Sequence, residues 1–569
     1  MMKRIFTILL QSLLLVALTF MVAAGQEEKI EETYSVWIGS SYTDFTDYTK
    51  KIGEFRNGDD EFLPEFSIDY LSRGINHIFS LNGKYRDENN IIADMSSKIG
   101  DGFSADFKYR SMFKQAGQDM LANLETREAG GGKMLTHEIL DPGADYYVHR
   151  KEIESSFNLR LSKKNNIRLI AAHRTVLQTG IEQHIASSHC FSCHLTSSTA
   201  TIDKITHQIM AGLQADLGKN TVGYQFGYRI FESEAPVNVA DFDDAIHPVF
   251  GTKGAEFGSR MIYEDVTLPV GEYPNTEKLS HKLTFKGDAG KSSYGSSISY
   301  SKATNKNNDL SSTALSGSAF YATSLADLTR LIARFSVARL DVESTFVDLP
   351  LYRDGRPGTP KDFDFTRYSS LNRLDLRGSV EVISRLNKRL TASFSTGIRL
   401  VDREYYPADD ADATTTFFGQ AKVRYRKGMR YSTSVKYRFE SSSNPFTSAR
   451  GLFEARGRSI LNSVDGTAFV YYWQREDLRY QDITTVPTQA HILDVTSSWR
   501  PNNKVNLNVG FKAKYDKNDN LDSLDISHFS MQPSLALNVN IDPKWTVSAG
   551  GSYAFKKSRG PVTIALFDG

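Results

Sequence analysis

The sequence is poor in cysteine, in tryptophan and in net charge. Two cysteines and four tryptophans occur among its 569 residues, and the formal net charge is +1. A charge so close to zero creates no overall field for nucleic acid, so no nucleic-acid partner is expected. The sequence has no recognisable hydrolytic motif, and Gly130-Gly131-Gly132 lacks the Lys-Ser/Thr context of a phosphate-binding loop. We therefore expect that the protein is not an enzyme.

Apolar runs long enough for a transmembrane helix are also missing after the first residues of the chain. Lys3 and Arg4 precede an apolar stretch over 5–22, and small residues at 22–25 follow it. This order predicts a secretory signal peptide over residues 1–25. The alternative is an uncleaved anchor, against which the polar residues 26–28 argue. No cysteine near the cleavage site allows lipid attachment.

Apolar and polar side chains alternate over long stretches of the C-terminal half. From 431 to 440, Tyr431, Thr433, Val435, Tyr437 and Phe439 alternate with Ser432, Ser434, Lys436, Arg438 and Glu440. A period of two indicates strands that face two different environments. The runs are about 9–13 residues long, and a tilted strand needs about 9–11 residues to cross a membrane. Soluble strands average nearer five or six residues.

The connections between these strands alternate between short and long. Short turns are expected at 162–166, 218–221, 386–389, 427–430, 464–466, 501–504 and 542–544, and long loops at 402–416, 440–455, 476–490 and 516–528. This pattern is typical of bacterial outer-membrane proteins. The sequence therefore predicts one large antiparallel transmembrane β-barrel over 26–569, with about 20–26 strands, an even number, in contact with outer-membrane lipid. A soluble β-helix is the main alternative, but the chain has no repeat of fixed period.

Residues 190–194 carry the one motif with specific chemistry, Cys190-Phe191-Ser192-Cys193-His194. C-x-x-C-H is the attachment pattern of c-type haem. Two thiols spaced in this way form thioethers to the haem vinyl groups, and His194 becomes the proximal iron ligand. The sequence thus predicts one covalent haem c. The alternatives are a Cys190–Cys193 disulfide, a zinc site with His189 and His194, and a dithiol redox site.

The motif lies in segment 177–204, which we expect to be a loop joining two long strands. The turns at 162–166 and 218–221 lie at the opposite ends of those strands, so this loop belongs to the outer side if the short turns are periplasmic. The distal haem ligand is predicted to be His184 or, as a second choice, His207. For each of these histidines the alternative is an ordinary polar residue near the membrane interface.

Basic residues gather on the polar side of several C-terminal strands. They are Lys422, Arg424, Arg426, Lys436, Arg438, Lys512 and Lys514. Two interpretations are open: the cations line a basic lumen, or they balance acidic residues on neighbouring strands.

The signal peptide, the barrel strands and the C-x-x-C element together resemble the MtrB/PioB group of outer-membrane porins. The resemblance implies a porin–cytochrome conduit for electron transfer, with a multihaem c-type cytochrome as partner. This chain differs in that its cysteine pair is internal and is followed by His194. The predicted function is electron transfer across the outer membrane through a barrel that carries one haem. The alternatives are a general or anion-preferring diffusion porin with a structural disulfide, and a barrel-anchored haem sensor or enzyme.

Overall fold

A computed structural model describes most of the chain after the predicted signal peptide. The described residues are 31–42, 54–55, 62–122, 128–129, 132–133, 136–189, 194–242, 266–343, 345–347, 365–367, 371–403, 413–443, 486–518, 526–542 and 544–560. The predicted signal peptide at 1–25, the predicted turn at 464–466 and Cys190 to Cys193 lie outside these residues. Among the described residues, no helix is long and apolar enough to cross a membrane.

The described structure consists of strands. In chain order they are β1 (Glu31–Tyr42), β2 (Phe62–Arg73), β3 (His77–Asp87), β4 (Asn90–Ile99), β5 (Phe103–Ala116), β6 (Glu128–Ala129), β7 (Gly132–Lys133), β8 (Thr136–Ile139), β9 (Tyr146–Ser162), β10 (Ile167–His189), β11 (His194–Leu217), β12 (Asn220–Ser233), β13 (Asn238–Phe242), β14 (Val266–Val270), β15 (Thr276–Ala289), β16 (Ser292–Asn305), β17 (Ser311–Ala326), β18 (Thr329–Val342), β19 (Thr345–Val347), β20 (Phe365–Arg367), β21 (Arg373–Arg385), β22 (Leu390–Arg403), β23 (Thr414–Lys427), β24 (Tyr431–Ser443), β25 (Gln489–Trp499), β26 (Val505–Asn518), β27 (Ile526–Asp542), β28 (Trp545–Ser552) and β29 (Phe555–Arg559).

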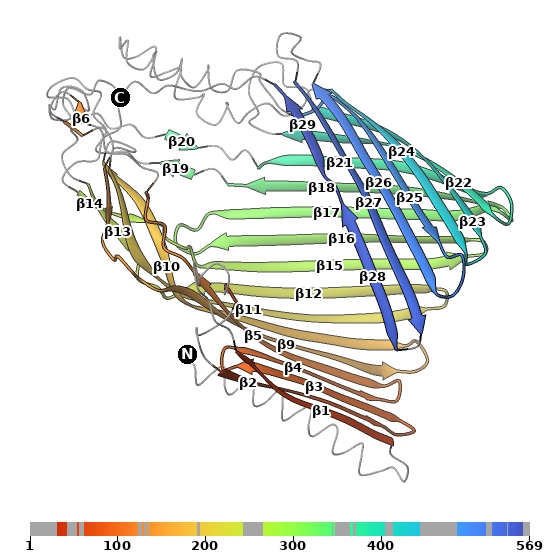
Figure 1. Ribbon diagram of the computed structural model, residues 1–569, viewed down its shortest axis with the longest axis horizontal. Coiled ribbons are helices and arrows are strands. Elements are labelled where there is room, and N and C mark those ends of the chain that lie inside the picture. Colours follow the sequence, from red (N-terminus) through yellow and green to blue (C-terminus); the bar gives the residue numbers. More distant parts are fainter. Residues whose placement is uncertain are drawn as a thin grey trace.

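The long strands form one antiparallel sheet in which each strand pairs with the next long strand along the chain. The ladder runs from β1 through β5 to β9, and then through β12, β15, β18, β21 and β24 to β28. Figure 1 shows β12 to β18 lying side by side across the sheet, with β28 at its C-terminal edge. The short strands β13–β14, β19–β20 and β6–β7 form separate pairs inside the connections. The predicted all-β, antiparallel architecture is confirmed.

The two faces of the sheet differ because opposite residues of paired strands project to the same side. Leu283 pairs with Ile298, and their exposed fractions are 48% and 56%. One residue earlier on β15, Lys282 pairs with Ser299. The same alternation continues across the sheet, so that one face is apolar and largely bare while the other is polar. A bare apolar face on such long strands suits lipid, and the polar face suits water.

Short connections lie on one side of the sheet and most long connections on the other. The observed short turns at 163–166, 218–219, 386–389, 428–430 and 500–504 confirm the predicted positions. All of them lie on the side where β1 and β28 begin. Exceptions on the long-loop side are the two-residue turn at 88–89 and the connection at 306–310.

Segment 177–204 differs from its prediction as a loop. β10 and β11 extend to His189 and His194, and backbone pairing continues from Leu177–Ile205 to Ser187–Leu195. The segment is thus the outer part of a long hairpin.

The number of long strands among the described residues is odd and not even as predicted, because β1 and β28 both begin on the short-turn side. Within these residues β1 pairs only with β2, and β28 and β29 only with β27.

A glycine marks the place where β10 leaves its partner β9. Gly180 has φ +147°, and the last pair of this ladder is Ile181 with Tyr147. A Cβ at Gly180 would lie 2.1 Å from the carbonyl oxygen of Tyr147. No side chain fits at that distance, so the position requires glycine.

We therefore predict that Gly180→Ala destabilises the protein by about 2 kcal/mol, because the backbone of β9 must move away. Gly419→Ala is the matched control, since a Cβ at this strand position would meet nothing within 4 Å. Urea unfolding followed by electrophoretic mobility shift measures both. Equal midpoints for the two variants would contradict the close approach at Gly180.

Candidate functional site

The β10–β11 hairpin is the first candidate site, because it carries the predicted haem motif at its tip. The backbones of His189 and His194 are paired, and the four residues between them, including Cys190 and Cys193, lie outside the described residues. The short strand β8 runs parallel to β11 beside the tip, with Thr136 paired to His194. At about 3.3 Å per residue, the part of the hairpin beyond Gly180 is roughly 30 Å long.

Segments of the long connections brace the outer part of this hairpin on both faces. On one face, the Tyr273 hydroxyl donates to Glu182 at 3.0 Å, and Lys204 Nζ lies 3.4 Å from the centroid of the Tyr273 ring. On the other face, the Gln183 side chain accepts from the backbone N–H of Asp119 and donates to its carbonyl, both at 2.7 Å. The hairpin is thus held in place by contacts that do not involve its tip.

His184 lies on the part of the hairpin beyond Gly180, and its role as distal haem ligand stays a prediction. It pairs with Ser198 and lies on the same face of the hairpin as Glu182. Its Nε2 atom is buried and has no hydrogen-bond partner within the described residues. The backbone of Gly271 packs against the imidazole, because a Cβ there would come within 2.7 Å of His184 Cε1. A buried ring nitrogen without a partner is costly unless a ligand binds it.

His207 does not fit the role of distal ligand, and this prediction is wrong. Its Nδ1 atom lies 3.0 Å from Thr175 Oγ1, which also contacts His173 Nε2 at 3.0 Å. The pairing register places His207 on the apolar face together with Ile209, opposite to the face of His184. It also lies about 40 Å along β11 from position 194. His207 is part of a compact polar group with His173 and Thr175.

The polar face from β21 to β26 is the second candidate site, because cations outnumber carboxylates there. The cations are Arg373, Arg377, Arg385, Arg399, Arg403, Lys422, Arg424, Arg426, Lys436, Arg438, Lys512 and Lys514; the carboxylates are Asp375, Glu381, Glu440, Asp494 and Asp516.

The predicted basic residues divide into those with an acidic neighbour and those without one among the described residues. Lys436 lies 3.2 Å from Asp494, Arg438 2.6 Å from Glu440, and Lys514 2.7 Å from Asp516. By contrast, Lys422, Arg424, Arg426 and Lys512 form no ion pair with any described residue. Acidic neighbours therefore balance some of the charge, and the remainder leaves this face basic.

Comparisons with known proteins add only a likeness of fold. No family model and no curated protein sequence matches the chain. Among solved structures, the chain is similar to the FrpB iron transporter from Neisseria meningitidis, with 9% identity, 92% of this chain and 81% of that chain covered, and a TM-score of 0.43. It is likewise similar to the copper transporter OprC, with 9% identity, 91% and 74% covered, and a TM-score of 0.45.

A third similar structure is BauA, the ferric preacinetobactin receptor from Acinetobacter baumannii, with 9% identity, 93% and 79% covered, and a TM-score of 0.44. The predicted location in the bacterial outer membrane agrees with the long antiparallel strands, one face of which is apolar and exposed. Membership of the MtrB/PioB group is not tested by any of these structures and stays a prediction, as does the cytochrome partner.

The predicted function is contradicted. The compared structures are named as transporters and receptors, not as electron conduits or diffusion porins. An electron-transfer porin, and the alternative diffusion porin with a Cys190–Cys193 disulfide, are therefore not retained. The chain's own chemistry also limits a conduit, because two cysteines can attach only one haem covalently, and one haem cannot span about 30 Å of hydrocarbon.

Proposed function

We propose that this chain is a solute-specific transport protein of the outer membrane, whose sheet closes into a barrel around a basic lumen. The observation that carries the proposal is the excess of cations over carboxylates on the polar face of β21 to β26.

Closure of the sheet follows from the cost of unpaired backbone groups in lipid. Each unsatisfied N–H or C=O group in the hydrocarbon layer costs several kcal/mol, so sheets that span membranes have no free edge. One edge of β1 is not paired with any described strand. Its side chains Tyr34, Val36 and Ile38 are apolar and exposed, which suits contact with lipid, where an unpaired edge would be costly. The edge opposite β1 belongs to β28 and β29. We infer that these two edges close the barrel.

Hydrogen exchange of the protein in lipid nanodiscs tests this closure. If the edge is paired, every backbone amide of residues 34–40 exchanges slowly. If β1 is a free edge, the amides that point away from β2 exchange fast while their neighbours remain protected. Residues 66–72 of β2, which are paired on both sides, provide the internal control.

A basic lumen selects solutes by charge. Cations on walls of low dielectric constant raise the local concentration of anions and repel other cations. Arg438 and Lys514 are held in place by their acidic partners, whereas Lys422 and Arg424 keep their charge available to a solute. The expected substrates are therefore anionic solutes.

Uptake of labelled glutamate and lysine into proteoliposomes tests the transport function. These amino acids have similar sizes and opposite net charges. We expect glutamate to enter at least about fivefold faster, with a rate that saturates with concentration, since steering by charge raises encounter rates by about tenfold or more. Equal rates that rise linearly with concentration would refute solute-specific transport.

We further propose that the tip of the β10–β11 hairpin carries a covalent haem c, bound by Cys190, Cys193 and His194, with His184 as distal ligand. The support is the C-x-x-C-H sequence together with the buried, unpartnered Nε2 atom of His184. When bound, such a group supplies redox and ligand-binding chemistry at the hairpin. The residues of the chain would fix its position and limit access of water.

Spectroscopy of the purified protein tests this proposal. The denatured wild-type protein should keep its haem, and Cys190→Ala with Cys193→Ala should lose it. In the folded protein, the wild-type haem should give a low-spin spectrum. His184→Ala should open the sixth position of the iron, so that the haem binds carbon monoxide. His207→Ala is the control, because His207 lies on the opposite face, and it should leave the spectrum unchanged. A wild-type protein without covalent haem would overturn the proposal.

A further inference from the structure

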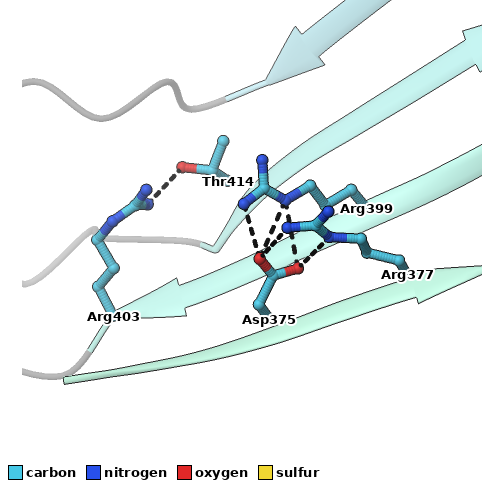
Figure 2. Close-up of polar contacts among 5 residues, drawn as sticks. All are labelled: Asp375, Arg377, Arg399, Arg403 and Thr414. Atoms are coloured by element: carbon cyan, nitrogen blue, oxygen red, sulfur yellow. Dashed lines mark hydrogen bonds and ion pairs between the residues drawn. The ribbon is translucent and has the colours of Figure 1, made fainter. Parts of the chain in front are cut away.

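Two neighbouring strands bring an unusual group of charged residues together at the long-loop end of the sheet. Asp375 is the third residue of β21, and Arg399 lies near the end of β22. The register places Arg377 directly opposite Arg399 and Arg373 directly opposite Arg403. Figure 2 shows the guanidinium groups of Arg377 and Arg399 converging on the carboxylate of Asp375, whereas Arg403 contacts Thr414.

A single carboxylate organises two of these guanidinium groups. Arg377 donates to Asp375 through Nε at 3.0 Å and Nη2 at 2.8 Å. Arg399 donates through Nε at 3.2 Å and Nη2 at 2.7 Å. The side chain of Asp375 is 10% exposed, whereas those of Arg377 and Arg399 are 57% and 47% exposed. The carboxylate is therefore largely covered, whereas both guanidinium groups are exposed on the polar face of the sheet.

The guanidinium groups of Arg377 and Arg399 each keep donors for a ligand. A guanidinium has five N–H donors, and contacts with Asp375 use the Nε and one Nη2 donor of each group. Arg403 lies four residues further along β22 than Arg399 and donates through Nη1 to the Thr414 hydroxyl at 3.0 Å. Arg373 is exposed on the same face. Four arginines and one aspartate give this group a net charge of +3.

We propose that Arg377 and Arg399 form a recognition site for solutes that carry two or more carboxylate groups, with Arg403 adding positive charge four residues further along β22. The inference rests on the proposed function and specifies its substrate class. Planar guanidinium forks match carboxylates in a bidentate geometry, which a diffuse positive potential does not. Two guanidinium groups side by side favour a polycarboxylate over a monocarboxylate, since each fork binds one carboxylate.

Asp375 is a positioning residue in this site. The negative charge of Asp375 lowers the attraction of the site for an anion. Asp375 therefore increases the affinity for an anionic solute only if the orientation of Arg377 and Arg399 matters more than the total charge. Without Asp375, two guanidinium groups on opposite residues of paired strands would repel each other and separate. A neutral residue in place of Asp375 should therefore weaken anion binding if orientation dominates, and strengthen anion binding if total charge dominates.

Calorimetric titration of the purified full-length protein with citrate tests the site. We expect Arg377→Gln and Arg399→Gln each to weaken citrate binding by about tenfold or more, as loss of charge-assisted hydrogen bonds does. Arg339→Gln is the matched control: Arg339 pairs with Leu374 on the neighbouring strand, projects to the opposite face, and lies at the same end of the sheet. It should change citrate affinity less than twofold. Equal loss in all three variants would overturn the site.

Asp375→Asn should also weaken citrate binding, although it raises the net charge. Tighter citrate binding by this variant would overturn the positioning role. Heat-modifiable mobility in gels confirms that each variant is folded. If the wild-type protein takes up glutamate but does not bind citrate, only the recognition site fails. If the wild-type protein takes up glutamate and lysine at equal rates that rise linearly with concentration, the transport function itself fails.

Discussion

The satisfaction of backbone hydrogen bonds in lipid is the constraint on which this structure depends. A hydrocarbon layer offers no partner for an N–H or C=O group, so each strand must be paired along its whole membrane-spanning length. The consecutive antiparallel ladder from β1 to β28 meets that requirement locally, because every strand pairs with the next long strand along the chain. The alternation of apolar and polar residues is then a direct result, since one face meets lipid and the other meets water.

The sequence predicted the features that depend on local pattern. Alternation over 431–440 located β24, and the turns near 386–389 and 500–504 were correct because short turns interrupt the period clearly. Segment 177–204 was mistaken for a loop because Ser, Thr and His occur on both of its faces, which hides the period of two. His207 was misassigned because the pairing register of β10 and β11, which places it on the face opposite to His184, is not visible in the sequence.

The cluster of Asp375 with Arg377 and Arg399 could not be found from the sequence, because it depends on strand register. Asp375 and Arg399 are far apart along the chain, and only the register between β21 and β22 brings them into contact. The alternation Arg373-Asp375-Arg377 was the one local signal, because residues two apart share a face. The polar face thus combines charges that acidic neighbours balance with charges that form no ion pair with a described residue.

The assignment of the two faces is most directly tested by chemical accessibility on β22. Phe394 and Ser395 are adjacent, and they belong to the apolar and the polar face, respectively. Single variants Phe394→Cys and Ser395→Cys, in a chain with Cys190→Ser and Cys193→Ser, would be treated with a charged, membrane-impermeant maleimide in intact outer-membrane vesicles. Labelling at Ser395→Cys and protection at Phe394→Cys is the predicted result. Labelling at Phe394→Cys with protection at Ser395→Cys would contradict an aqueous lumen bounded by the polar face.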